Sequence, residues 1–135
     1  MNPILKKKLS ILIHLASADG DFDRTERSYI LDICDRNNVS HEECEKLIDK
    51  PEPIGSLGAL SYTKAVEYMS DCFSLMLIDG KIRSSEVILC EDVGLRLGFS
   101  KLDIDQVITD ISEDMRIPAD KIMILVKSMK HSGKI

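Results

Sequence analysis

One short phrase occurs twice in this chain of 135 residues, and it constrains the fold more than any other feature. Each copy reads as an apolar stretch, an Asp-Gly pair, a polar residue, a large apolar residue, three further residues and a glutamate. The aspartates are Asp19 and Asp79, 60 positions apart (79 − 19), and the glutamates are Glu26 and Glu86. Because glycine tolerates the left-handed conformation that follows a helix, the phrase predicts the same helix–turn–helix corner in both places.

Apolar residues recur at three- and four-residue spacing through most of the chain, as at Leu5, Leu9 and Leu12. This spacing is typical of helices that bury one face, and no stretch alternates apolar and polar residues as a half-buried strand would. We therefore predict an all-α fold, a compact bundle of about seven helices. The helices are expected at about 4–18, after Asp23, from Ser40 to Lys50, at about 60–78, from Ser84 or Ser85, after Ser100 and after Pro118.

The two corners lie in two similar stretches, about 4–49 and 60–113, and each stretch is predicted to hold three helices. The segment 51–58 between them is rich in proline and glycine, and it is too short and too apolar for a free linker. A chain of this length usually forms one domain. We therefore predict a single domain over 1–135, built from two related three-helix units and a C-terminal helix, with a frayed tail at 131–135.

Polar side chains stand at several of the predicted helix starts. Asp23 and Glu26 have the spacing of a capping box, in which each side chain accepts a hydrogen bond from the backbone of the other. Ser40 and Glu43 have the same spacing, and the counterpart of Ser40 in the second half is Ser100. These residues predict capped starts for the second, third and sixth helices.

The chain carries a formal net charge of −5. That charge argues against nucleic-acid binding, because affinity for duplex DNA or RNA comes largely from clustered lysine and arginine. Basic residues do gather at the two ends, as in Lys6-Lys7-Lys8, and we interpret them as solvated ends rather than a polyanion site. No apolar run approaches the roughly 20 residues that span a bilayer, so membrane insertion is not expected.

Four cysteines, Cys34, Cys44, Cys72 and Cys90, are dispersed through the helical patterns. Free cysteines in such positions behave as small buried apolar residues, which indicates reduced thiols and a cytoplasmic location. Residues 1–18 also mimic a secretory signal, with basic residues followed by an apolar run and small residues. A similar apolar stretch precedes the second Asp-Gly pair, where no signal can act, so we interpret the first stretch as a helix of the fold.

The phrase also resembles the second half of an EF-hand calcium loop, in which a glycine makes the turn and a glutamate binds calcium through both oxygens. The first and third ligand positions would fall on Leu15 and Ser17 in the first copy and on Leu75 and Leu77 in the second, and these residues are mostly apolar. Those residues argue against a functional EF-hand. A zinc pair at His41 and Cys44 lacks a second pair of ligands in the sequence, and a core cysteine is the favoured interpretation.

Two copies of helix–Asp-Gly-x-apolar-x-x-x-Glu–helix, 60 residues apart in an acidic helical domain, resemble the TerB family, which is named for tellurite resistance. The resemblance covers nearly the whole chain. Similar domains occur in bacterial stress operons and in a membrane-anchored DnaJ-type co-chaperone. The resemblance implies a non-enzymatic accessory domain of the bacterial cytoplasm that acts in metal or oxyanion stress and binds a partner protein.

The resemblance also implies that the acidic residues of both phrases form one shared site for a divalent metal. The matching residues are Asp19, Glu26, Asp79 and Glu86. Their oxygen ligands would favour calcium, magnesium or manganese over zinc. The second copy has Lys81 and Arg83 where the first has Asp21 and Asp23, and this difference argues against a symmetric site for two metals.

Two other interpretations remain open. In a ligand-free protein-interaction module, each aspartate would accept hydrogen bonds within its own turn and each glutamate would cap its own helix. A small enzyme would use the clustered carboxylates as acid and base, although the sequence has no recognisable phosphate loop or nucleophile motif. The shared site exists only if the two halves pack so that their corners meet. Stability that depends on an added ion would separate the metal-binding domain from the ligand-free module.

Overall fold

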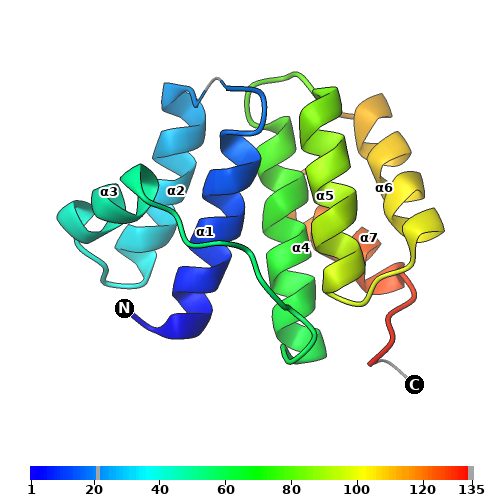
Figure 1. The fold of residues 1–135 in the computed structure, drawn as a ribbon. Coiled ribbons are helices and arrows are strands. Elements are labelled where there is room, and N and C mark those ends of the chain that lie inside the picture. Colours follow the sequence, from blue (N-terminus) through cyan, green and yellow to red (C-terminus); the bar gives the residue numbers. More distant parts are fainter. Residues whose placement is uncertain (21, 134–135) are drawn as a thin grey trace.

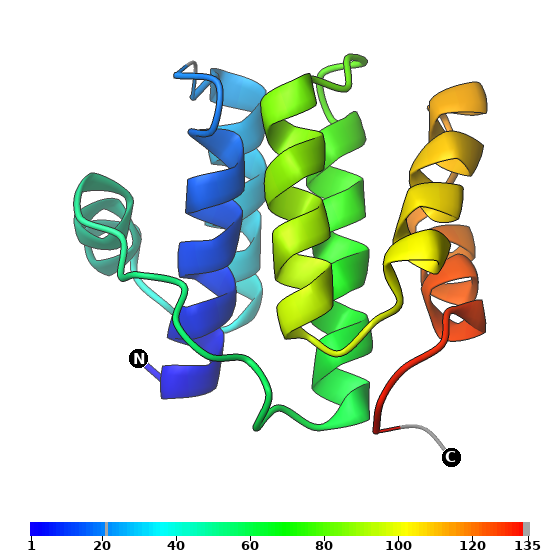
Figure 2. The same ribbon diagram turned by 45° about the vertical axis from the view of Figure 1, so that its right-hand side comes forward.

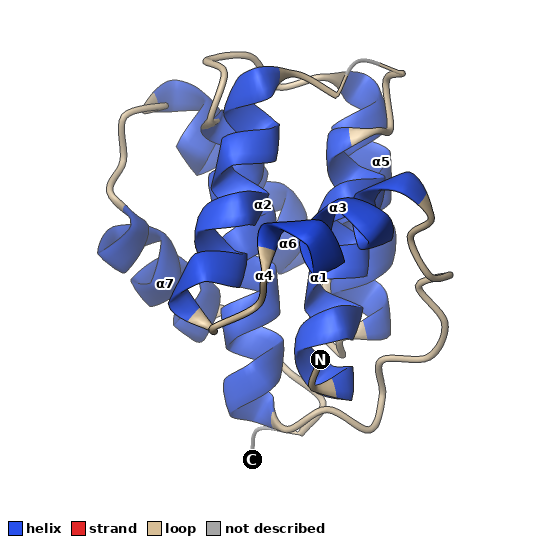
Figure 3. Ribbon diagram, turned by 90° about the vertical axis from the view of Figure 1, so that its left-hand side faces the viewer, coloured by secondary structure: helices blue, strands red, loops and turns tan. Residues whose placement is uncertain are grey.

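The computed structural model describes residues 1–20 and 22–133, and these residues fold almost entirely into helices (Figure 1). The helices are α1 (Pro3–Ala16), α2 (Arg24–Arg36), α3 (His41–Asp49), α4 (Tyr62–Leu77), α5 (Ser84–Arg96), α6 (Lys101–Glu113) and α7 (Ala119–Ser128). Figure 3 shows helix and loop but no strand over this part of the chain. The prediction of an all-α bundle of about seven helices is therefore confirmed.

The long helices α1, α2, α4 and α5 stand side by side and form the body of the bundle (Figures 1 and 2). The shorter α3 lies outside the first pair, whereas α6 and α7 lie outside the second pair. The contact between α4 and α7 is the most extensive between any two helices described. In the described chain, no helix combines the length and the apolar character needed to cross a membrane.

The core is aliphatic and sulfur-rich, because the chain has no tryptophan and few other aromatic residues. The centre of α1 contributes an almost continuous buried stretch from Leu9 to Ala16, and Phe73 of α4 is fully buried. The four cysteines are free and buried, as predicted from their positions on apolar helix faces. The loop between the halves runs across α1 (Figure 2), where the His14 ring lies 2.8 Å from the Glu52 carbonyl oxygen.

The helix ends confirm some of the predicted caps and contradict others. Asp23 and Glu26 form the predicted capping box, with the Glu26 N–H donating to Asp23 Oδ1 at 2.8 Å. Ser40 caps α3 through a 3.2 Å bond from the Glu43 N–H. Ser100 stands at the start of α6, but its side chain makes no capping bond, so that part of the prediction is wrong.

The α5 helix begins at Ser84, as predicted. Its N-cap residue is Arg83. An arginine side chain has no acceptor atom and cannot cap the free N–H groups of a helix. The Glu86 carboxylate still accepts a 3.0 Å hydrogen bond from the Arg83 N–H, which is half of the capping box seen in the first corner.

The C-terminal segment is more ordered than predicted. The Ser132 N–H donates to the Gly98 carbonyl at 2.9 Å, and Phe99 and His131 form an isolated antiparallel bridge. The His131 ring packs edge-on against Phe99 and Tyr62. The prediction of a frayed tail is therefore wrong for 131–133, while 134–135 lie outside the described residues.

Candidate functional site

The two Asp-Gly turns lie at the same end of the bundle, at the top of Figure 1. One turn joins α1 to α2 and the other joins α4 to α5, and each places its glycine at a positive φ, 82° for Gly20 and 77° for Gly80. Glycine adopts this conformation without the steric penalty that other residues carry. The repeated phrase thus produces the same turn twice, and the bundle brings the two turns together.

Arg83 links the two turns directly. Its Nε lies 2.7 Å from Asp19 Oδ2 in the first half, and its Nη1 lies 2.6 Å from Asp79 Oδ2 in the second half. The same Nη1 is 3.9 Å from Glu86 Oε1. These side chains are largely shielded from water, with exposed fractions of 29% for Arg83, 17% for Asp19 and 14% for Asp79. Partial burial strengthens ion pairs relative to pairs in bulk solvent.

A group of three carboxylates lies beside this ion-pair network. Asp23 and Glu26 of the first corner and Asp79 of the second each offer an oxygen, and these oxygens lie within 4.8 Å of one another. We call the five acidic residues and Arg83 the acidic junction; its members are Asp19, Asp23, Glu26, Asp79, Glu86 and Arg83. The junction draws on both halves of the repeat, as the shared site requires.

Both glutamates of the junction are buried, each with an exposed fraction of 2%. Burial raises the pKa of Glu26 from 4.5 to about 7; the Asp23 N–H opposes this shift, and the charges of Asp23, Glu86 and Asp79 add to it. Burial also raises the pKa of Glu86, with the Arg83 N–H bond acting in the opposite direction. For both glutamates the loss of hydration on burial is the main cause of the raised pKa, and the neighbouring acidic charges are smaller contributions.

Asp79 behaves differently because it has strong donors. Burial favours its protonated form, but hydrogen bonds from the Arg83 guanidinium and the Lys81 N–H outweigh burial and lower the pKa of Asp79. The Lys81 N–H donates to Asp79 Oδ1 at 3.1 Å, while Arg83 contacts Oδ2. Asp79 is therefore ionised at neutral pH, and it both pairs with the guanidinium and belongs to the three-carboxylate group.

The predicted site residues all lie at the junction, but in two different environments. Asp19 and Glu86 face Arg83, whereas Glu26 belongs to the three-carboxylate group and Asp79 belongs to both. Sequence reasoning assigned Asp23 only a capping role, although its carboxylate also joins the group. The sequence did show that the two corners differ in charge, because Arg83 stands 60 positions after Asp23 and so takes its place in the second copy. Asp21, the other acidic difference between the copies, lies outside the described residues.

The donor set of the three-carboxylate group fits a hard divalent cation. Calcium, magnesium and manganese prefer carboxylate oxygens, and a position among three of them would offset their mutual repulsion. The side of the junction at Asp19 is already neutralised by the guanidinium. The residues therefore fit one cation among Asp23, Glu26 and Asp79, and they do not fit two symmetric cations. Cys44 is buried, as the favoured interpretation predicts, and the exposed His41 ring lies 2.8 Å from the Asp35 carboxylate.

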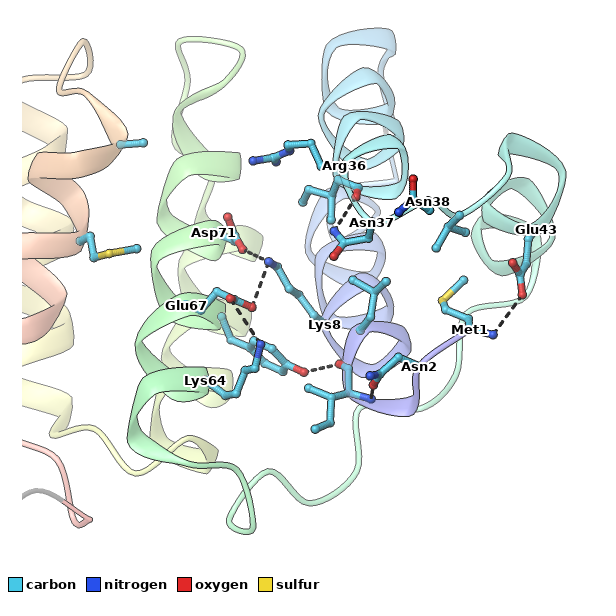
Figure 4. Close-up of a pocket in the computed structure, with 17 residues that line it drawn as sticks. Met1, Asn2, Lys8, Arg36, Asn37, Asn38, Glu43, Lys64, Glu67 and Asp71 are labelled. Carbon is cyan, nitrogen blue, oxygen red and sulfur yellow. Dashed lines mark hydrogen bonds and ion pairs between the residues drawn. The ribbon is translucent and has the colours of Figure 1, made fainter.

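A second feature is a groove of about 750 Å³ between α1, α2, α4 and α7. Figure 4 shows Lys8 reaching across it from α1, with its Nζ 2.5 Å from Asp71 and 3.3 Å from Glu67, both on α4. Tyr29 of α2 donates to the other oxygen of Asp71 at 3.0 Å. These contacts join three helices, which is a sufficient structural role for the charged residues of the groove.

Comparisons of the chain with protein-family models, curated proteins and solved structures found no match. The resemblance to the TerB family therefore stays a prediction that rests on the doubled phrase.

Proposed function

We propose that this chain is a non-enzymatic, TerB-like accessory domain that binds one divalent cation at the acidic junction. The ligands would be Asp23 and Glu26 from the first corner and Asp79 from the second. The observation that carries the proposal is the approach of their oxygens to within 4.8 Å of one another across the two halves. In the cell, the domain would act in bacterial metal or oxyanion stress together with a partner protein.

The electrostatics of the junction support a cation as its ligand. Among the ion pairs of the described residues, the Arg83 guanidinium contacts Asp19, Asp79 and Glu86 but neither Asp23 nor Glu26. The pKa of buried Glu26 is raised to about 7. A bound cation would favour the ionised form of Glu26 and remove repulsion among the three ligands. Calcium, magnesium and manganese are the ions that such oxygen ligands favour.

A raised carboxyl pKa is also typical of acid–base enzymes. An enzyme needs that group beside a hollow that holds the substrate. The groove of Figure 4 is lined by residues from the first turns of α1. Glu26 lies in the first turn of α2, which comes after the last turn of α1 and therefore lies at the other end of the bundle. This separation favours binding over acid–base catalysis as the role of Glu26.

The second candidate is the ligand-free protein-interaction module. The observation that favours it is Arg83, whose guanidinium already pairs with Asp19 and Asp79 at 2.7 and 2.6 Å. In this alternative the junction is a structural clasp between the halves, and binding to a partner uses another surface.

Thermal unfolding in chelator and in millimolar calcium, magnesium or manganese separates the two candidates. A cation at about a hundred times its dissociation constant adds roughly 2.7 kcal/mol to the free energy of unfolding. The metal-binding proposal predicts a higher Tm with at least one of these ions and loss of the increase in Asp79→Asn. The exposed Asp49 of α3 supplies the matched control, and Asp49→Asn should keep the full increase. An identical Tm in chelator and in all three ions would favour the ligand-free module.

A further inference from the structure

Asp23 and Arg83 occupy the same position in the two halves, but only Asp23 caps its helix with its side chain. Asp23 is the N-cap of α2, and its carboxylate accepts the Glu26 N–H at 2.8 Å. Arg83 is the N-cap of α5, where no side-chain cap bond exists. Because the guanidinium has no acceptor to offer to α5, its cap position leaves it available to the carboxylates of both turns.

The Arg83 guanidinium contacts acids from both turns. Its Nε and Nη1 each meet a carboxylate oxygen, one on Asp19 and one on Asp79, and Nη1 is also 3.9 Å from buried Glu86. Two of these acids, Asp19 and Glu86, are the counterparts of the proposed ligands Asp79 and Glu26, so the repeat would supply them to a cation in the second half. Arginine suits the role, because its planar, permanently charged group donates in two directions at once.

We propose that Arg83 is a built-in counter-cation that fills one of the two cation positions of the junction. It limits the site to a single exchangeable cation and weakens that site by competing for Asp79. The competition follows from the contacts of Asp79, whose Oδ2 pairs with Arg83 and whose Oδ1 accepts the Lys81 N–H at 3.1 Å. An incoming cation must share Asp79 with a fixed positive charge, which also repels it. The part of this inference that concerns the exchangeable cation rests on the proposed function.

The test replaces Arg83 and measures how stability depends on cations. In Arg83→Gln the carboxylates face one another without a counter-charge, so its Tm in chelator should fall below that of the wild type. Millimolar calcium or manganese should then restore the Tm, and titration calorimetry should give an affinity at least about tenfold higher than in the wild type, given the strength of charge pairs at such distances. Arg83→Asp, which places the residue of the first corner in the second, should bind two equivalents of cation.

Arg96 offers a matched control on the same helix. Its Nε pairs with Asp92 at 3.2 Å and its Nη1 donates to the Gly55 carbonyl at 2.9 Å, both away from the junction. Arg96→Gln should change stability by the same amount in chelator and in calcium. If Arg83→Gln behaves like Arg96→Gln, with equal losses in both conditions, Arg83 is only a structural clasp and the inference is overturned.

The outcomes for the inference and for the proposed function are distinguishable. Cation-dependent stability in Arg83→Gln but not in the wild type supports the counter-cation and contradicts a native metal site. Equal cation affinity in both proteins supports the metal site and contradicts competition by Arg83. If Arg83→Gln or Arg83→Asp is unfolded in chelator, the helix content is measured by circular dichroism after addition of calcium or manganese. Recovery of helix supports the inference, and a chain that stays unfolded in both ions overturns it.

Discussion

At the first corner, the Asp23 side chain caps α2, and its negative charge lies beside Glu26. At the second corner, the Arg83 side chain makes no capping bond to α5, and its positive charge lies beside Asp19, Asp79 and Glu86. The backbone turns are alike, with Gly20 and Gly80 at nearly the same φ. The two corners therefore share their backbone geometry, while their side chains differ in charge. An internal repeat can place equivalent residues together in space without giving them equivalent chemistry.

The two halves also differ at their outer helices. In the first half α3 packs on both α1 and α2, whereas α6 packs mainly on α5, and α7 covers α4. The α7 helix has no counterpart in the first half, so the second half depends on a helix outside the repeat.

Removing a core side chain of α7 tests that dependence and should give the largest effect. Ile122 is 2% exposed, and truncation of a buried isoleucine costs about 2–5 kcal/mol. Denaturant unfolding of Ile122→Ala should show a loss in this range. Ile124, on the same helix but 65% exposed, provides the control, and Ile124→Ala should change stability by less than about 0.5 kcal/mol. Equal losses would mean that α7 is not packed as described.

The charge difference between the corners can be tested by measuring how the free energy of unfolding depends on pH, because the buried Glu26 and Glu86 have raised pKa values. The pKa of Glu26 is raised from 4.5 to about 7, so the folded chain binds this proton more tightly than the unfolded chain does. The stabilisation is present in full below about pH 4.5 and is lost as the pH rises through about 7. At roughly 1.4 kcal/mol per pKa unit, the loss amounts to roughly 3 kcal/mol.

The neutral variant Glu26→Gln should therefore become more stable relative to the wild type as the pH rises across this interval, when unfolding is measured in chelator. Glu86→Gln should show a smaller change, because the charge of Arg83 favours the ionised form of Glu86. A pH profile of Glu26→Gln parallel to that of the wild type would contradict an uncompensated carboxyl at the first corner.

Substitution of the turn glycines should affect both corners equally. Gly20 and Gly80 have positive φ angles, and nothing lies within 4 Å of a Cβ added to either one. The cost of Gly20→Ala or Gly80→Ala is then the left-handed conformation alone, about 1–2 kcal/mol each. Gly58 is equally open but does not have a positive φ, so Gly58→Ala should be neutral or slightly stabilising. Thermal unfolding of the three variants checks this. Unequal losses of stability for Gly20→Ala and Gly80→Ala would contradict the similarity of the two backbone turns.

The serine caps should give the smallest effects and the sharpest contrast between the halves. Ser40 accepts the Glu43 N–H at 3.2 Å, whereas Ser100 makes no capping bond with its side chain. Ser40→Ala should lose about 1 kcal/mol, and Ser100→Ala should lose much less. Comparable losses in denaturant unfolding would show that the third helix of each half begins in the same way.

The sequence was sufficient to predict the helices and the two glycine turns, but not the order of residues 131–133 or the pairing of charges. Three- and four-residue spacing of apolar residues predicted the helices, and Gly20 and Gly80 predicted where two of them end, because both signals are local. Asp19, Glu26, Asp79 and Glu86 were predicted to converge, and all four lie at the acidic junction. Local signals could not predict the direction of the Arg83 side chain, since that depends on the packing of two segments 60 residues apart.

A double-mutant cycle between Asp19 and Arg83 tests most directly the claim that the two corners form one junction. The cycle compares Asp19→Asn, Arg83→Gln and the double variant in chelator by denaturant unfolding. Neighbouring residues in one charge network are coupled by about 0.5–3 kcal/mol, and the 2.7 Å contact across the halves predicts a favourable coupling in that range. Additive losses, with no coupling beyond experimental error, would mean that the corners do not meet and that the chain has no shared site.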